Sequence, residues 1–495
     1  MSDQPNIIII MADQLRRDAL GPYTPNINAL AQESTVFNRC YCASPLCVPA
    51  RGAFFTGRYC NETGSLINPW VPQDYEHGVV EAGIPNLYGL LEDEWDSWHT
   101  GKQHLYTAEE IDKQPNSKTK WNTLEKGYSK HLQAQDLRGP GGDAYRGMMP
   151  ELVSGLFTRM TTYSIPTTGC YPHGFDNFFD GYITKTSLQA IRERDTSRPF
   201  MLNAMYIAPH PPLEIPEPWY SLVKSEDIEL PENVGRWGQD QSPLQLWNLT
   251  GLLGTRYSRE DWQEVWRVYL GLVALFDHGV GMVLDELKTQ GLYDESLIIL
   301  TADHGEMLGS HRLWQKMCNY EESAHVPLYV RTPESMRGTE ANESDELVSH
   351  IDIMPTILDY IGHEIPDGVT GLSLRSAING GQLGRDRVFC QFDGNGALGN
   401  FSRTVVCGDY KLNADMFKGE TFFELFDLKN DPQEMTNLAF GQPERVAELL
   451  PSLIGWMRET GDLQNLSGED YKVFRKEYEA FRERAARKAQ AFNRI

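Results

Sequence analysis

The stretch Asn6-Ile-Ile-Ile-Ile-Met-Ala-Asp13 decides the fold class of this chain. A short, unbroken run of β-branched and apolar residues that ends at a carboxylate is typical of a central parallel strand, covered on both faces. Three later segments are predicted to behave alike, each as a strand that delivers polar, titratable residues at its carboxyl end. They lie at 96–100 before Lys102 and His104, at 200–207 before His210, and at 297–301 before Asp303 and His304.

Helical stretches lie between these strands. The clearest is 262–287, which is closed by Lys288 and Gly291 as a helix end should be. Strands that alternate with helices predict an α/β fold, with a large doubly wound sheet flanked by helices. Ligands of such sheets bind in the crevice at the carboxyl ends of the strands. The polar residues that follow the strands therefore form the candidate site.

The pattern changes beyond about residue 370 to short strands and a helix at 443–459. This change predicts a smaller C-terminal α+β subdomain, with a small antiparallel sheet and a packed helix. We therefore expect a catalytic domain at 1–370, the subdomain at 371–465 and a helical tail at 466–495. The short strands are predicted at 388–392, 404–406, 410–413 and 422–426.

Two long segments, 107–165 and 212–260, are polar, weakly periodic and rich in Gly, Pro and Trp. Long segments without clear periodicity are usually functional lids or binding loops. We expect both to be loops of this kind.

The tail carries an aromatic stripe at spacings of three and four residues, which predicts a helix with one packing face. The stripe consists of Tyr471, Phe474, Tyr478 and Phe481. From Glu469 to Ile495 there are eight basic and five acidic residues, so this stretch carries +3 on a chain that is otherwise −27. The stripe packs either on its own domain or on a neighbouring subunit, which makes a homo-oligomer one possible state.

Composition excludes several classes of protein. With 40% apolar and 23% charged residues, the 495-residue chain is globular rather than disordered or fibrous. Its 45 basic and 69 acidic residues leave a net charge of −24, which disfavours nucleic acid and anionic membranes as partners. An anionic substrate would have to meet a local basic pocket. The N-terminus does not read as a signal peptide, no segment reaches transmembrane length, and the eight cysteines do not suggest a disulfide framework. We expect a cytoplasmic protein.

The densest chemical signal is Ser44-Pro-Leu-Cys47-Val-Pro49-Ala-Arg51, followed by Thr56-Gly-Arg58. Pro49 is well placed to open a helix, which would set Cys47 at the helix N-terminus. Free N–H groups there favour an anion or a thiolate. Arg51, one turn further on, would face the same ligand. The alternative is a buried cysteine beside a structural arginine.

Two acidic pairs that end two buried strands indicate a metal site. Asp13, Gln14, Asp303 and His304 supply two carboxylates, an amide oxygen and an imidazole. Each Asp taken singly could cap a helix or form a turn, but together they suit a hard cation with one borderline ligand. The imidazole leaves both Ca²⁺ and Mn²⁺ open.

Together these residues resemble the type I, formylglycine-dependent sulfatases of the alkaline phosphatase superfamily. The Asp-Gln start and Asp-His end are nearer to choline sulfatases and phosphonate monoester hydrolases than to arylsulfatases with an Asp-Asp start. The stretch Glu424-Leu-Phe-Asp-Leu-Lys-Asn-Asp-Pro432 is similar to the family's C-terminal subdomain. The other matching motifs, in the family's order, are Asp13-Gln14, Cys47-Val-Pro-Ala-Arg51 with Thr56-Gly-Arg58, Gly101-Lys102-x-His104, Pro209-His210-Pro-Pro212, Thr301-Ala-Asp303-His304-Gly-Glu306, and Lys316 before Tyr320-Glu-Glu-Ser323.

The resemblance implies an alkaline phosphatase-like mixed sheet and a chemistry for each motif. Cys47 would be converted by a formylglycine-generating maturation enzyme, and the aldehyde hydrate would be the nucleophile on sulfur. One divalent metal, Ca²⁺ first and Mn²⁺ second, would neutralise the sulfate oxygens with Arg51 and Lys102. His104 would act as base on the hemiacetal hydroxyl. His210 and Lys316 are candidates to protonate the leaving alkoxide, and Asn68 to contact the transferred group.

Several alternatives stay open. The leading prediction is hydrolysis of a sulfate ester; the closest rival is hydrolysis of phosphonate monoesters or phosphodiesters with the same site. A metal-binding interaction protein with unmodified Cys47 is a third possibility. A sugar, a choline-like group or an aryl group could carry the sulfate, because tryptophans can stack on a sugar or enclose a quaternary ammonium. These tryptophans are Trp70, Trp121, Trp237, Trp247 and Trp314. His311 is assigned no role.

Overall fold

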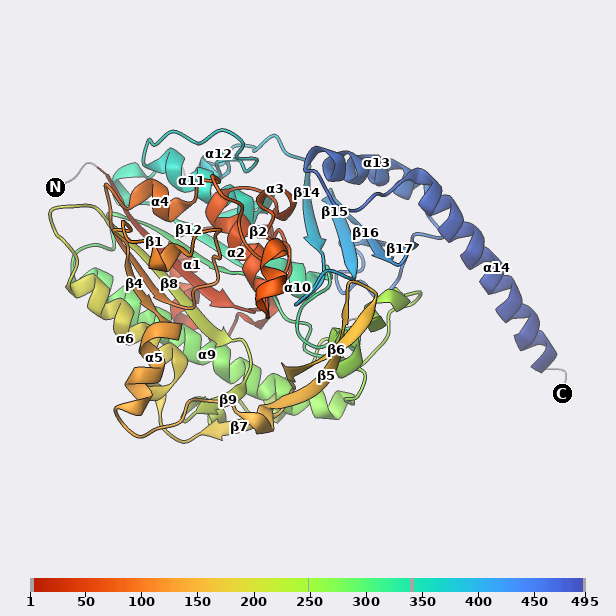
Figure 1. Cartoon of the computed structure of the whole chain (residues 1–495), viewed down its shortest axis with the longest axis horizontal. Helices are drawn as coiled ribbons and strands as arrows, with labels where there is room; N and C mark the ends of the chain where they lie inside the picture. Colours follow the sequence, from red (N-terminus) through yellow and green to blue (C-terminus); the bar gives the residue numbers. More distant parts are fainter. Residues whose placement is uncertain (1–3, 248, 339–341, 493–495) are drawn as a thin grey trace.

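The apolar run that begins at Asn6 forms the centre of a nine-stranded sheet (Figure 1). The computed structural model describes residues 4–247, 249–338 and 342–492. Strand β1 (Asn6–Asp13) pairs in parallel with β10 (Ser296–Ala302) on one side and β8 (Phe200–Pro209) on the other. Strand β3 (Asp96–Gly101) continues the sheet in parallel beyond β8. All four predicted strands are confirmed, and their carboxyl ends meet along one edge.

The remaining strands make the sheet mixed. The order is β11-β2-β12-β10-β1-β8-β3-β4, with β13 paired to β2. Strand β12 runs antiparallel to both β10 and β2, and β11 antiparallel to β2. These strands carry few consecutive apolar residues, so the sequence pattern did not predict them. Their bounds are β2 Thr35–Tyr41, β4 Lys120–Thr123, β11 His325–Val326, β12 Leu328–Arg331 and β13 Glu343–Ser349.

Helices cover both faces of this sheet, as the α/β prediction required (Figure 1). Helices α6 (Phe179–Arg192) and α9 (Arg259–Thr289) pack together against β8. Helix α2 (Cys47–Thr56) packs with α11 (Ile353–Tyr360) on the other face. The other helices are α1 Pro25–Gln32, α3 Cys60–Thr63, α4 Leu87–Leu91, α5 Leu124–Gln133, α7 Trp219–Leu222, α8 Leu249–Gly254, α10 Glu321–Ala324, α12 Arg375–Ile378, α13 Pro443–Glu459 and α14 Gly468–Phe492.

Helix α9 begins and ends as its sequence predicts. At its start Ser258 accepts a hydrogen bond from the Asp261 N–H, and the Asp261 carboxylate accepts one from the Ser258 N–H. Gly291, with φ of +67°, follows its end. By length and composition α9 could cross a membrane, contrary to the expectation that no segment could. Most of its apolar stretch is buried inside the protein, as in the core helix of a globular domain.

The C-terminal part forms the predicted antiparallel sheet and packed helix. The strands β14 (Arg387–Phe392), β15 (Phe401–Cys407), β16 (Tyr410–Phe417) and β17 (Glu420–Asp427) pair in chain order. The core of this sheet is shared with the segment around α2 and α3, where the Tyr59 ring contacts Trp456 at 5.3 Å. The second sheet therefore supports the helix that begins at Cys47. The domain boundaries at 370 and 465 stay predictions.

The two segments expected to be long loops contain regular structure. Segment 107–165 holds β4, α5 and a hairpin of β5 (Arg146–Val153) and β6 (Phe157–Ser164). Segment 212–260 holds β9 (Leu213–Pro216), which pairs with β7 (Thr168–Tyr171), and short helices. The hairpin was missed because its apolar residues Met148, Phe157 and Met160 are exposed, which removes the usual alternation of buried apolar and exposed polar positions. All eight cysteines are free thiols, as expected.

Candidate active site

The carboxyl ends of β1 and β10 bring two buried carboxylates together. The Asp303 N–H donates to the Ala12 carbonyl at 3.1 Å, which continues the parallel ladder beyond the strands. The Gln14 N–H donates to Asp303 Oδ1, also at 3.1 Å. Gln14 has a φ of +68°, a left-handed conformation that turns the chain sharply after Asp13. Both acidic pairs predicted at these strand ends therefore lie side by side.

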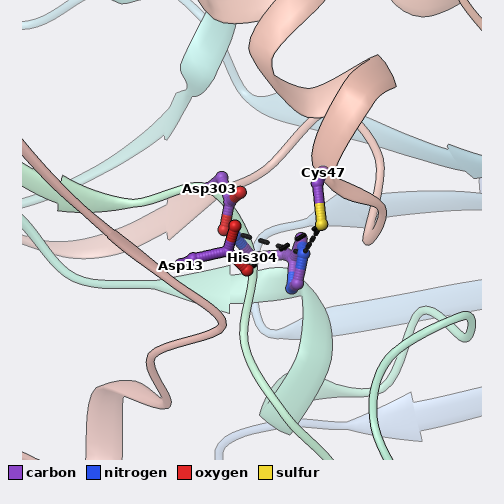
Figure 2. A group of neighbouring side chains, drawn as sticks. All are labelled: Asp13, Cys47, Asp303 and His304. Carbon is purple, nitrogen blue, oxygen red and sulfur yellow. Dashed lines mark hydrogen bonds and ion pairs between the residues drawn. The ribbon is translucent and has the colours of Figure 1, made fainter. Parts of the chain in front are cut away.

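Cys47 is the first residue of α2, so Pro49 is the third helical residue and not the opening one. The Cys47 Sγ lies 3.1 Å from His304 Nε2 (Figure 2). It also lies 3.5 Å from Lys316 Nζ. Burial and Asp13 act to raise the pKa of the thiol, but Lys102, Lys316 and His304 outweigh them and lower it. The site thus favours an anionic group at this position.

Arg51 lies one helical turn after Cys47 and joins both carboxylates. Its Nε donates to Asp303 Oδ2 at 3.0 Å and its Nη2 to Asp13 Oδ2 at 3.1 Å. Lys102 Nζ also pairs with Asp13, and the Lys102 carbonyl accepts from Arg51 Nη1 at 3.1 Å. Burial acts to raise the pKa of Asp13, but Lys102, His210 and Arg51 hold it well below its usual range.

Lys316 contacts the amide of Gln14, and that amide is oriented by a residue to which the sequence assigned no role. Lys316 Nζ donates to Gln14 Oε1 at 2.6 Å. On its other side the Gln14 amide nitrogen donates to the carboxylate of Glu306, which also accepts the Leu308 N–H at 3.0 Å. Glu306 is buried, and its pKa is raised by that burial. The Glu306 contact therefore turns the amide oxygen of Gln14 toward Lys316.

His104 and His210 lie at the margin of the same site. His210 Nε2 lies 4.0 Å from Asp13 Oδ1, while its Nδ1 lies 2.6 Å from the Pro211 carbonyl oxygen. The pKa of each histidine is well below its usual value, first because of burial and then because of neighbouring cations. Among the described residues, His104 Nδ1 has no hydrogen-bonding partner. Both rings are therefore neutral near pH 7.

Asn68 lies at the N-terminus of α2. Its Oδ1 accepts a hydrogen bond from the Val48 N–H at 3.0 Å. The first N–H groups of a helix have no partner inside the helix, so this contact satisfies one of them. The structure thus gives Asn68 a capping contact in addition to its place near the cluster.

The loop that carries Lys316 has an unusual backbone. Leu308, His311, Arg312, Gln315 and Met317 all have positive φ values, between 43° and 81°. Such conformations cost energy in residues other than glycine and concentrate at functional sites. Tyr163 of the β5–β6 hairpin supports the loop by donating to Gln315 Oε1 at 2.8 Å. No sequence signal pointed to Tyr163, because its partner lies 152 positions away.

The tryptophans proposed for substrate contact fall into different environments. Trp314 is fully buried and donates to the Ser164 carbonyl, so its assignment as a stacking surface is wrong. Trp121 packs against Tyr88 and His99. Trp70 is half-buried with the Arg159 guanidinium 5.6 Å from its ring, and Trp237 is exposed. The side chain of Trp247 lies outside the described part of the structure.

The donor set fits a divalent metal ion. One ligand atom each from Asp13, Cys47, Asp303 and His304 lies within 4.8 Å of the others, and all four residues are buried (Figure 2). His304 Nδ1 lies 2.9 Å from the Gly305 carbonyl, which fixes the ring with Nε2 toward the cluster. Burial acts to lower the His304 pKa, but Asp303 and Cys47 outweigh it and raise it. Asp13, Asp303 and His304, with the oxygen of Gln14, can therefore hold such an ion.

The side chains also form the local basic pocket that an acidic protein needs for an anionic substrate. Two carboxylates, Asp13 and Asp303, face three buried cations, Arg51, Lys102 and Lys316. The excess of positive charge surrounds Cys47 Sγ, within a chain whose net charge is −24. In a buried site such charges act on a bound anion with little screening.

Comparisons with known proteins place this geometry in a family. The family model described as Sulfatase matches residues 5–363, and the model described as N-sulphoglucosamine sulphohydrolase, C-terminal, matches residues 309–458. An arylsulfatase of Clostridium perfringens is 27% identical over 88% of this chain and 90% of its own length. A choline-sulfatase of Rhizobium meliloti is 27% identical over 88% of this chain and 82% of its own length.

The fold has solved counterparts. A phosphonate monoester hydrolase from Silicibacter pomeroyi superposes with a TM-score of 0.73 at 24% identity and covers 93% of this chain and 96% of its own. The Sulfatase model matches most of the chain and spans every strand end of the site. The chain therefore belongs to the sulfatase family, the sulfuric ester hydrolases of the alkaline phosphatase superfamily.

Proposed function

We propose that the chain hydrolyses a sulfate ester through a formylglycine formed from Cys47 and one divalent metal ion, releasing inorganic sulfate and an alcohol. The observation that carries this proposal is the position of Cys47 Sγ, at a helix N-terminus and within 3.8 Å of Lys102, Lys316 and His304. The sulfur stands where the oxygens of an aldehyde hydrate would be. Cys47 is also the only one of eight cysteines in a Cys-x-Pro-x-Arg sequence.

The modified residue would supply the covalent chemistry. One hydroxyl of its hydrate forms an O–S bond as the ester S–O bond breaks, and the other then expels sulfate as the aldehyde C=O re-forms. A metal ion held by Asp13, Gln14, Asp303 and His304, Ca²⁺ first and Mn²⁺ second, supplies positive charge for the sulfate oxygens.

The chain's own cations hold and orient the ester. Arg51 is fixed by Asp13 and Asp303, and Lys102 is fixed by Asp13, so both are positioned before the substrate arrives. Preorganised charges of this kind stabilise the transition state without a reorganisation cost. His104, neutral and with an unpartnered Nδ1, can accept the proton of the second hydroxyl.

Lys316 is the better donor of the proton that the leaving alkoxide needs. Its Nζ lies 3.5 Å from Cys47 Sγ, whereas His210 has a lowered pKa and its Nδ1 contacts the Pro211 carbonyl. A neutral His210 can instead hydrogen-bond the substrate through Nε2. Asn68, whose oxygen is bound to Val48, keeps its amide nitrogen for the transferred group.

The same site would suit a phosphonate monoester or a phosphodiester, because its cations also match a tetrahedral phosphorus ester. The Asp13-Gln14 and Asp303-His304 pairs resemble those of choline sulfatases and of phosphonate monoester hydrolases alike, so this alternative stays open. For the sulfate ester, a sulfated sugar, a choline-like ester and an aryl ester are the substrate classes to compare. A panel of these sulfates and a phosphonate ester, assayed with metal-loaded enzyme, separates the two functions.

The nucleophile is tested by mass spectrometry of the Cys47 peptide from protein made with and without the maturation enzyme. We expect formylglycine only in the first, with activity following the converted fraction and absent in Cys47→Ala. An intact thiol in fully active protein contradicts the proposal. The metal is tested with Asp303→Ala, which we expect to bind one ion fewer than the wild type and to lose turnover; an unchanged ion count with unchanged turnover would show that the ligand assignment is wrong.

A further inference from the structure

A second cluster of metal-ligating side chains lies outside the active site. It consists of His311, Glu322, Glu434 and Asn233, and we name it the His311 cluster. One ligand atom each from His311, Glu322 and Glu434 lies within 4.8 Å of the others. The residues come from four separate segments: the loop after β10, helix α10, the segment after β17, and the turn near residue 233. None of them is a ligand proposed for the catalytic metal.

The cluster contains polar atoms without partners. Among the described residues, Glu322 Oε2 and Asn233 Oδ1 have no hydrogen-bonding partner, and the Gln433 backbone, the one such partner of the His311 ring, leaves one ring nitrogen unpaired. The relative exposures of these residues are 9%, 0% and 0%, respectively. Glu322 and the Gln433 backbone lie near enough to His311 to oppose the lowering of its pKa by burial. Unpaired polar atoms at such depth are costly and rare, which indicates a missing partner.

Other contacts hold these side chains in place. The Asn233 amide nitrogen donates to Glu322 Oε1, so the free Oε2 and Oδ1 atoms belong to a fixed pair. The His311 ring stacks on Tyr320 with centroids 4.2 Å apart and planes 9° from parallel. The His311 N–H donates to the Asn233 carbonyl at 3.1 Å. The donors are therefore oriented in advance.

The net negative charge of the His311 cluster favours a bound cation. Buried Lys411 pairs with Glu321 at 3.0 Å and with Glu434 at 2.9 Å. Burial, together with Glu321 and Glu322, raises the pKa of Glu434 although Lys411 opposes the shift. With Glu322 and neutral histidines, these three carboxyl groups and one ammonium therefore sum to −2 when Glu434 is ionised and to −1 when it is protonated. Arg16 also lies near Glu322, but it is paired with Asp18 at 2.6 Å. A divalent cation would neutralise the remainder, and an anion would add to it.

We propose that the His311 cluster binds a second divalent metal ion of the Zn²⁺ or Mn²⁺ class. An imidazole nitrogen with carboxylate and amide oxygens is a donor set that suits these ions. Glu434 Oε1 has a second lone pair beside its contact with Lys411, and so can still bind the ion. Glu322 also lines a cavity of about 1090 Å³, which gives the ion a path to the cluster.

The ion would stabilise the loop after β10, which carries both His311 and Lys316. The Glu322 carbonyl accepts the Glu306 N–H at 2.8 Å, and His311 lies on the same loop as Lys316. A metal bond between these segments and Glu434 would tie that loop to the C-terminal sheet. Its role is structural, so its loss should change stability in addition to metal content.

The test is metal stoichiometry of the full chain, stripped with a chelator, reloaded with MnCl₂ or ZnCl₂, desalted and analysed by plasma mass spectrometry. We expect two ions in the wild-type chain, one in Asp303→Ala and one in His311→Phe, which keeps the stacking on Tyr320 but removes both nitrogens. His363→Phe, at a half-buried histidine outside both clusters, is the matched control and should keep two.

Three results would overturn the proposal. They are a wild-type chain that holds no ion at saturation, Asp303→Ala with none, and folded His311→Phe that holds as many ions as the wild type. If His311→Phe does not fold, anomalous diffraction from wild-type crystals soaked in MnCl₂ decides, because the ion must appear between His311 and Glu322. Since the readout is ion content, it is independent of whether the sulfatase chemistry proposed above is correct.

Discussion

Lys316 is positioned to act on the leaving group rather than on the sulfate alone. Its contact with Gln14 Oε1 holds the ammonium 3.5 Å from Cys47 Sγ. Proton donation matters most when the leaving alkoxide is strongly basic and therefore a poor leaving group. We predict that Lys316→Met lowers kcat for an alkyl sulfate by about 10²-fold or more and for a nitrophenyl sulfate by less than about tenfold.

Steady-state kinetics on the two esters checks this prediction, and His210→Asn is the control. Because His210 is neutral, we expect His210→Asn to affect both esters equally. If Lys316→Met lost the same factor on both substrates, Lys316 would be a charge-stabilising group and not the proton donor.

Glu306 acts on the metal site through Gln14. The Gln14 amide nitrogen donates to Glu306, so the amide oxygen must face the cluster. Groups that orient a ligand typically contribute 10–100-fold to metal affinity. We predict that Glu306→Leu weakens Mn²⁺ binding by about tenfold or more, while Glu306→Gln, which keeps an acceptor, changes it by less than about threefold.

Competition with a chromophoric chelator measures both affinities. Near-ultraviolet circular dichroism verifies that the two variants remain folded. Normal Mn²⁺ affinity in folded Glu306→Leu would show that Gln14 needs no orienting partner.

Single residues differ in how far the sequence predicts them. Cys47 and Arg51 lie four positions apart in one helix, so local spacing was enough to put both on one ligand. Glu306 stands within a recognised motif, yet its contact with Gln14 spans 292 positions. Strand ends can be paired across such a distance because parallel strands share an edge, but no pattern pairs two individual side chains, and the same holds for Tyr163 and Gln315.

Helix α2 begins at Cys47, the proposed nucleophile, and Asn68 caps this helix by accepting a hydrogen bond from the Val48 N–H. Loss of a side-chain cap usually costs about 1 kcal/mol. We predict that Asn68→Ala lowers the free energy of unfolding by about 1 kcal/mol, and that Asn68→Ser, which retains a capping oxygen, recovers part of that loss. Urea titrations of the two variants and the wild type supply the comparison.

Kinetics on the same proteins separates capping from substrate contact. If the Asn68 amide also binds the transferred group, kcat/KM should fall in both variants even where stability recovers. A variant of wild-type stability and wild-type kcat/KM would leave Asn68 with neither role.

Among the elements, burial on both faces decided what could be predicted. Strands β1, β8 and β10 are enclosed between helices, so their sequences are nearly unbroken apolar runs. Strand β3, Asp-Ser-Trp-His-Thr-Gly, is buried along its whole length although its sequence is largely polar. Strand β2 has the mixed sequence Thr-Val-Phe-Asn-Arg-Cys-Tyr, and its place in the sheet depends on partners from distant segments. The β5–β6 hairpin was not predicted for another reason: several of its apolar side chains are exposed, so its sequence lacks the alternation of apolar and polar residues.

At the level of the whole molecule, the net charge is negative while the charge around Cys47 is positive. The surface is acidic, while buried arginine and lysine surround Cys47. This arrangement was predictable in kind, because an acidic chain needs a local basic pocket for an anion. The cytoplasmic location stays a prediction.

The aromatic stripe of the C-terminal helix α14 was expected to pack either on its own domain or on a neighbouring subunit, and the structure shows packing on its own domain. Tyr471 and Phe474 are buried on their own subunit, where Tyr471 donates to the Ala439 carbonyl and Phe474 contacts Phe422 and Phe423. Phe481, by contrast, is 60% exposed, and the end of the helix extends away from the body of the molecule (Figure 1). Tyr478 also packs on its own chain, with its ring stacked on Phe440 at a centroid distance of 3.3 Å. Of the four stripe residues, only Phe481 is therefore left exposed.

We predict an oligomer contact at the end of α14, from residue 480 onward, which contains the exposed Phe481. A lone helical segment of this length is marginal in water without tertiary packing. From residue 480 onward there are five basic residues and one acidic residue, so this segment carries +4 and the rest of the chain −28. Such a segment is matched electrostatically to the surface of a neighbouring copy. A chain that stops after Glu479 keeps Tyr471 and Phe474, so we expect it to stay folded but to lose the oligomer.

Light scattering on the truncated and the full-length chain measures the mass of each. Added salt should weaken the wild-type assembly because the contact is charged. An unchanged mass after truncation, or a monomeric wild type, would show that the end of α14 makes no such contact.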